Sequence, residues 1–179
     1  MTRSVSDYLD LTVDDAQRQL LSIQRRRMPA PGVRQVDFVP VETLLCLAGM
    51  LLVEGSRFGG SSAHRAPRPV PELARLFRRP PSSITSKMAN LEGVRPRGAK
   101  SDHIVWITLH SDTARLSEIY RSILAAARDV GLGPDVLPDF LGIEESGNVA
   151  TLGQDEMNGS LLEQLLREAL STKTDHPST

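Results

Sequence analysis

Apolar residues recur at helical spacing in the first half of the chain. In residues 13–23 they form one stripe, and Thr12 stands where a helix N-cap is expected. Residues 40–55 begin with Pro40 and are apolar on nearly all sides, which is typical of a helix at the centre of a core. The pattern predicts an amphipathic helix followed by a central one.

Two shorter apolar patterns follow in close succession. Residues 70–77 place apolar side chains on one helical face, and residues 83–93 repeat the pattern with Ile84, Met88 and Leu91. Only Arg78, Arg79, a pair of prolines and Ser82 separate them. Short helices joined by so tight a turn predict a pair like a helix-turn-helix.

The second half of the chain is less uniform. Residues 112–131 predict a helix capped by Asp112 and closed by Gly131, and residues 160–171 predict another amphipathic helix. Residues 134–147 are a candidate for a short helix, while residues 103–111 alternate as a strand does and stay ambiguous. We expect an all-α, mainly helical and compact domain over residues 1–150, and a C-terminal helix with a disordered tail over 151–179.

Glycine and proline mark the connections between these elements. Residues 28–40 form a Pro/Gly-rich connector, and residues 57–69 combine adjacent glycines with alternating prolines, so we expect irregular loop structure there. Residues 93–102 form a second loop, which is basic.

Charge changes the picture because it is unevenly distributed. The net charge is −1, yet residues 57–100 hold ten lysines and arginines against two glutamates, Glu72 and Glu92. Such a segment attracts a polyanion while the rest of the chain balances it. A nucleic-acid partner is one interpretation, and a basic face that only contacts solvent is the other.

Several function classes lack their motifs. Cys46 is the single cysteine, so an internal disulfide and a cysteine-based zinc site are excluded, and its apolar surroundings predict a buried thiol. No metalloprotease, nucleotide-phosphate or nucleophile-elbow motif occurs, and the four histidines fall in loops, in the ambiguous segment or in the tail. We expect no catalysis, no metal and no cofactor. No apolar stretch approaches the roughly 18 residues of a membrane span.

The helix entrance at residues 78–93 is the strongest candidate for a binding surface. Pro80 and Pro81 suit the first helical positions, and the amides of Ser82, Ser83 and Ile84 are then expected to point outward at the positive end of the helix. Lys87 and Asn90 follow on the side of Ser83. This arrangement predicts an anion site, although an ordinary helix start has the same pattern.

A family resemblance sharpens this prediction. The segment PELARLFRRPPSSITSKMANLEG, preceded by FGGSSAHR and followed by PRGAK, resembles the sulfur-binding domain of phosphorothioate-dependent HNH restriction endonucleases. The likeness covers roughly residues 40–130. It implies a mostly helical module that binds DNA in which sulfur replaces a non-bridging phosphate oxygen. No nuclease motif is present, so the chain resembles the recognition part of such an enzyme, expected in the bacterial cytoplasm with a fused nuclease as partner.

The resemblance also assigns residues. Pro81 would pack its ring on the sulfur beside Pro80, and His64 and Arg65 would close the other side of the pocket. Pro80 departs from the family, whose members often carry threonine or an aromatic residue there. The implied DNA contacts are Arg79, Ser82, Ser83, Lys87, Asn90, Arg97 and Lys100.

Three alternatives stay open at this point. An ordinary helix-turn-helix regulator would read bases through the helix that begins at Pro81. A protein–protein adaptor would use the basic segment to bind an acidic partner. A nuclease acting alone would cut DNA with the help of a metal.

Overall fold

The computed structural model describes residues 3–28, 30, 35–94 and 100–144. Its helices are α1 (Ser6–Leu9), α2 (Val13–Gln24), α3 (Pro40–Gly49), α4 (Val70–Phe77), α5 (Pro81–Glu92), α6 (Lys100–His110) and α7 (Thr113–Asp129), with 3-10 helices η1 (Gly55–Phe58) and η2 (Gly60–Arg65). No strand occurs in these ranges, which confirms the all-α prediction.

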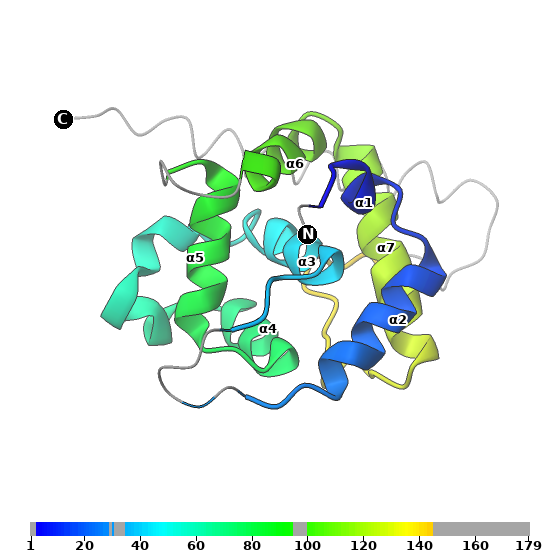
Figure 1. Ribbon diagram of the computed structural model, residues 1–179, viewed down its shortest axis with the longest axis horizontal. Helices are drawn as coiled ribbons and strands as arrows, with labels where there is room; N and C mark the ends of the chain where they lie inside the picture. Colours follow the sequence, from blue (N-terminus) through cyan, green and yellow to red (C-terminus); the bar gives the residue numbers. More distant parts are fainter. Residues whose placement is uncertain (1–2, 29, 31–34, 95–99, 145–179) are drawn as a thin grey trace.

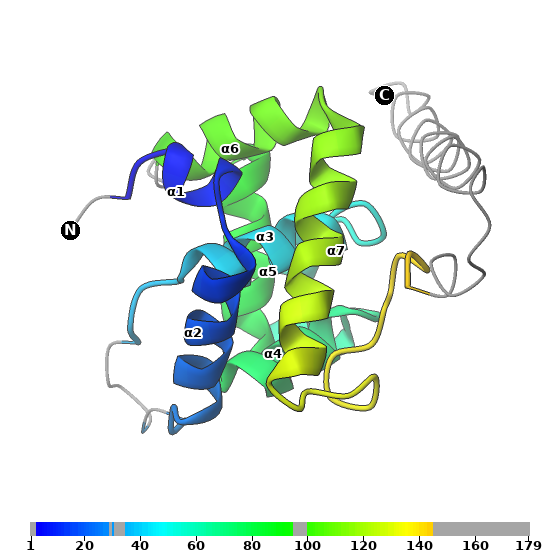
Figure 2. The same cartoon turned by 90° about the vertical axis from the view of Figure 1, so that its right-hand side faces the viewer.

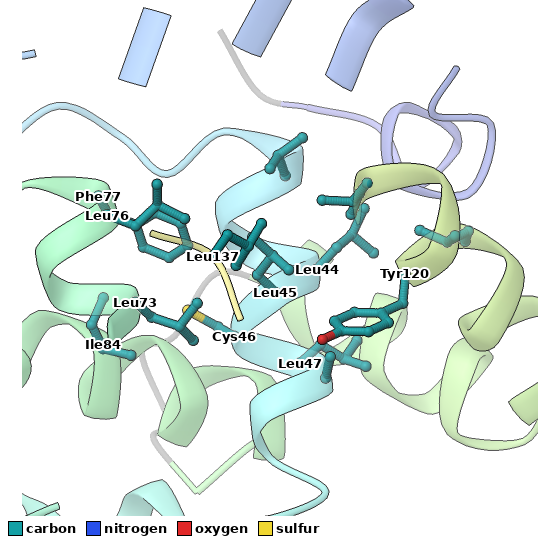
Figure 3. Close-up of a cluster of buried hydrophobic side chains, with 14 of the residues drawn as sticks. Leu44, Leu45, Cys46, Leu47, Leu73, Leu76, Phe77, Ile84, Tyr120 and Leu137 are labelled. Atoms are coloured by element: carbon teal, nitrogen blue, oxygen red, sulfur yellow. The ribbon is translucent and has the colours of Figure 1, made fainter. Parts of the chain in front are cut away.

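Helix α3 is the centre of the molecule. Every residue from Pro40 to Gly49 is buried, and α2, α4, α5 and α7 all pack against it (Figures 1 and 3). Cys46 has no exposed surface, which confirms the predicted core thiol, and burial raises the pKa of its thiol far above the ordinary value. The uniformly apolar sequence of this helix is explained by neighbours on all its sides.

Helices α2 and α7 pack against each other on one side of α3 (Figures 1 and 2). Both predicted caps are confirmed. The Thr12 hydroxyl accepts from the Asp15 amide at 3.1 Å, and the Asp112 carboxylate accepts from the Arg115 amide at 3.0 Å. These bonds satisfy helix-end amides that would otherwise lack a partner.

Helices α4 and α5 form the predicted pair. Helix α4 ends at Arg78, whose φ of 55° is left-handed, and the chain then turns into α5 at Pro81. The predicted inner face of α5 is confirmed, since Ile84, Met88 and Leu91 are fully buried. The 3-10 helices η1 and η2 pack along the same helix (Figure 1).

The contact between η1 and α5 requires a glycine. A Cβ on Gly55 would lie 2.5 Å from the Cβ of Met88. Because that distance is well below van der Waals contact, only a residue without a side chain lets the two elements approach this closely. Gly55 therefore fixes the position of α5 beside η1.

Four features differ from the sequence-based expectation. In the ambiguous segment, residues 103–110 are helical, with Val105 and Leu109 facing the core while Ile104 and Ile107 are exposed. The stretch expected to be irregular at 57–69 contains 3-10 turns, and residues 134–144 form turns rather than a helix. Helix α1 was not predicted at all. The expected helix at 160–171 lies outside the described residues.

Trp106 packs against the core cluster while staying partly exposed, in line with the core role that its apolar neighbours indicate. Within the described ranges, no helix combines the length and apolar character needed to cross a bilayer.

Candidate functional site

The half-buried side of α5 borders two adjoining clefts. One, here the α6 cleft, has a volume of about 590 Å³ and extends to α1, the Gln35–Phe38 segment and Asp102 of α6. The other, here the η2 cleft, has a volume of about 390 Å³ and reaches Gly60 of η2 and the serines of the first turns of α5. Four residues line both clefts: Phe38, Ser83, Lys87 and Asn90.

The helix entrance differs in part from the prediction. Pro80 is the extended N-cap residue, and Pro81 is the first residue of α5, as expected. The amide of Ser83, however, donates to the Pro80 carbonyl oxygen at 2.9 Å, so it is not available to a ligand. The amide of Ser82 donates no hydrogen bond to any described residue.

The serine hydroxyls, like the amides, differ in whether they are available to a ligand. Ser83 donates its hydroxyl to Gln35 Oε1 at 3.1 Å, which ties α5 to the segment that precedes α3. Ser82 and Ser86 line the η2 cleft, and their hydroxyls have no partner among the described residues. The η2 cleft therefore presents free hydroxyl donors, as an oxygen-rich ligand requires.

Arg79 requires a correction. Its side chain is 2% exposed, and its guanidinium donates to Glu42 at 2.8 Å from Nε and 3.2 Å from Nη2. Glu42 is fully buried and also accepts from Arg26 at 2.5 Å and from the Val39 amide at 2.9 Å. Arg79 lines the α6 cleft, but its guanidinium is engaged by this internal network, which disfavours a contact with an outside phosphate.

Neighbouring arginines have different roles because of the backbone. The left-handed turn at Arg78 directs the next side chain, that of Arg79, toward the start of α3, where Glu42 stands. Arg78 stays exposed and forms no ion pair with any described residue. The same is true of Arg65 and Arg75, so the positive charge of these three arginines is not paired within the described part of the chain.

Lys87 is the cation that lines both clefts. Its Nζ lies 2.7 Å from Asp102 Oδ2, with the two side chains 10% and 2% exposed. Phe38 lies beside this pair: its ring centroid is 4.9 Å from Lys87 Nζ and 3.9 Å from Arg79 Cζ. The aromatic ring therefore makes cation–π contacts with both cations, and Asp102 compensates the charge of Lys87.

The charge of Asp102 acts on Tyr8 in the α6 cleft. Tyr8 lines this cleft, and its pKa is raised mainly by burial and next by the charge of Asp102. Both effects disfavour the phenolate, so Tyr8 is a neutral hydrogen-bonding wall at ordinary pH.

The structure brings some of the predicted site residues together. Ser82, Ser83, Lys87 and Asn90 share the half-buried, cleft-lining side of α5, as expected. Pro80 and Pro81 are half-buried at its entrance, while His64 and Arg65 are exposed on η2. None of those four lines either cleft, and Gly60 is the η2 residue at the cleft edge. Arg97 and the side chain of Lys100 lie outside the described part.

Sequence reasoning missed Gln35, Phe38, Ser86 and Asp102. The first two fall in the Pro/Gly-rich connector, where no periodic pattern points to them. Asp102 is separated by 15 positions from its partner Lys87, and only the fold shows that they meet. Ser86 had a detectable signal, since it follows Ser82 by one helical turn.

Comparisons with protein-family models, with curated proteins and with solved structures find no match to this chain. Among the residues that the structure describes, no group of histidine, cysteine and carboxylate side chains is placed to hold a metal ion.

Proposed function

We propose that this chain binds phosphorothioate-modified double-stranded DNA through the entrance and the cleft-lining side of α5, as the targeting module of a modification-dependent restriction endonuclease. The strongest support is that one helix combines two features. It begins at two prolines, and its hydroxyl, amide and ammonium groups border two clefts. Polar groups in such a row suit a nucleic-acid backbone and its base edges.

The proline entrance supports the preference for sulfur. A phosphorothioate keeps its charge, but its sulfur is larger and a weaker hydrogen-bond acceptor than oxygen. Pro80 and Pro81 present ring carbons and no amide donor at the half-buried start of α5. An oxygen placed against them loses water and gains no hydrogen bond, which costs about 1–3 kcal/mol.

The remaining contacts supply affinity that does not depend on sulfur. Arg78 and Arg65 are exposed without ion pairs, and Ser82 and Ser86 offer free hydroxyls on the same side of the helix. These groups suit the phosphates that flank the modified position. Their contribution falls with salt, because binding releases counterions from the DNA.

The test compares two duplexes of one sequence, with and without a single sulfur. We expect at least about tenfold tighter binding of the modified duplex, which corresponds to the lower part of the desolvation cost. Equal affinities would favour an ordinary DNA-binding protein over the sulfur proposal. No binding to either duplex at low salt would favour the protein–protein adaptor.

Pro81→Ala tests the role of the entrance. We expect the preference for sulfur to fall to near unity, because the ring contact is lost, with only a modest loss of stability. Pro71→Ala is the matched control: Pro71 is exposed in the first turn of α4. A preference that survives Pro81→Ala, or falls equally in Pro71→Ala, would contradict the assignment.

A further inference from the structure

We infer that Asp102 lowers the affinity of this protein for the DNA backbone by neutralising Lys87, until a DNA phosphate takes the place of Asp102 beside Lys87. The inference rests on the proposed DNA binding but not on its preference for sulfur. It assigns the role of lowering the general affinity for DNA to Asp102 of α6, a residue outside the set that was expected to contact DNA.

The cations around the two clefts are not equally available. Arg79 is locked by Glu42, and Arg3 donates to the carbonyl oxygen of Phe38. Lys87 reaches both clefts, and its ammonium is held by Asp102 at 2.7 Å. A phosphate that enters the η2 cleft therefore meets a lysine whose charge is already compensated.

The carboxylate of Asp102 is suited to release its partner. Glu42 accepts from two guanidinium groups and one amide, whereas the described hydrogen bond to Asp102 comes from Lys87 alone. Asp102 also lies in the first turn of α6, an 11-residue helix whose positive end stabilises a negative charge. When Lys87 turns to a phosphate, Asp102 keeps this second source of stabilisation.

A compensated lysine lowers binding to DNA in general. The negative field of Asp102, which is also felt at Tyr8, opposes a phosphate beside α5. Fewer counterions are then released on binding, so ordinary DNA is bound more weakly at any salt concentration. Contacts that depend on the modification can decide binding only when this general attraction is small.

The test is Asp102→Asn with a sulfur-free duplex, measured over a range of salt concentrations. We expect about fivefold to tenfold tighter binding, from the Coulomb interaction of one charge at close range. We also expect the slope of log affinity against log salt to steepen by about 0.9. The matched control is Asp14→Asn, an exposed aspartate in the first turn of α2 with the same change in net charge.

An affinity of Asp102→Asn equal to that of wild type, or no higher than that of Asp14→Asn, would overturn the inference. If Asp102→Asn does not fold, the double variant Lys87→Met with Asp102→Leu takes its place, since it leaves no unpaired charge. We expect the double variant to bind sulfur-free DNA within about twofold of wild type, because the charges removed cancel. A loss as large as that of Lys87→Met alone would overturn the inference.

The two proposals fail in different ways. The inference predicts that Asp102→Asn tightens binding to modified and sulfur-free duplexes by the same factor. If wild type shows no preference for sulfur and Asp102→Asn still tightens binding, the sulfur proposal is wrong and the inference stands. If neither protein binds a duplex at the lowest salt, both are wrong.

Discussion

Two carboxylates hold the cations of the α5 entrance, and they differ in what surrounds them. Glu42 is fully buried and joins Arg26, Arg79 and the Val39 amide, with the Arg79 side chain only 2% exposed. Asp102 holds Lys87, whose side chain is 10% exposed and lines both clefts. Both carboxylates are buried and both cations line the α6 cleft, but only Lys87 also lines the η2 cleft.

The comparison shows that two cationic residues can have different roles. Arg79 and Lys87 both looked like DNA contacts from their places beside and on the helix. The cations themselves separate the two pairs. The Arg79 side chain is 2% exposed and donates two hydrogen bonds to Glu42, so it contributes to stability, whereas the Lys87 side chain is 10% exposed and lines both clefts, so it can exchange its partner for a ligand. The predictions below test this division.

The largest effect is expected for Glu42→Gln. The change leaves Arg79 buried beside a neutral amide, so we expect the free energy of unfolding to fall by about 3–5 kcal/mol, measured by chemical denaturation. Glu118→Gln, an exposed position on α7, is the control and should stay within about 0.5 kcal/mol of wild type. A loss below about 1 kcal/mol would mean that the Glu42 network is not structural.

A smaller loss of stability is expected for Asp102→Asn. Lys87 reaches the clefts and can take water in place of the carboxylate, so we expect a loss of about 1–2 kcal/mol in the same denaturation experiment. A loss as large as that of Glu42→Gln would erase the difference between the two carboxylates.

The tyrosines give a pH test. The chain has two, and burial is the main cause that raises the pKa of both Tyr8 and Tyr120. Because the folded pKa is raised, stability is constant below the unfolded pKa of about 10 and falls as the pH rises above it. Ultraviolet absorbance of the phenolate should show that the tyrosines ionise at higher pH in the folded than in the unfolded chain.

The same titration separates the two carboxylates. Asp102 is the second cause of the raised pKa of Tyr8, and Glu42 is not among its causes. We therefore expect Asp102→Asn to move the first ionisation to lower pH and Glu42→Gln to leave it in place wherever that variant stays folded. Identical titrations in the two variants would contradict the placement of Tyr8 beside Asp102.

The fold could be predicted where burial places apolar residues in a helical pattern along the sequence. The apolar stripe of α2, the uniformly apolar α3 and the inner face of α5 each have neighbours that explain their pattern. The apolar pattern was misleading at α6, because exposed Ile107 falls between buried Val105 and Leu109 and the three together imitate the alternation of a strand. Helix α1 has only four residues, too few to show a period.

The candidate site was predictable only along its own helix. Ser83, Lys87 and Asn90 follow from helical spacing, and the structure places them together. The partners of these residues come from distant segments. Gln35, Phe38 and Asp102 meet α5 through tertiary packing, and nothing in local sequence reveals that Asp102 compensates Lys87 or that Glu42 withdraws Arg79 from the surface.

The central claim is that the entrance of α5 distinguishes sulfur from oxygen in a DNA backbone, and the ratio of two affinities tests it most directly. The wild-type protein is titrated with the modified and the sulfur-free duplex at several salt concentrations. We predict that both affinities fall as salt rises while their ratio stays near tenfold or above, because the preference arises from desolvation and not from charge. A ratio of one, or a ratio that decreases as salt rises, would contradict the account.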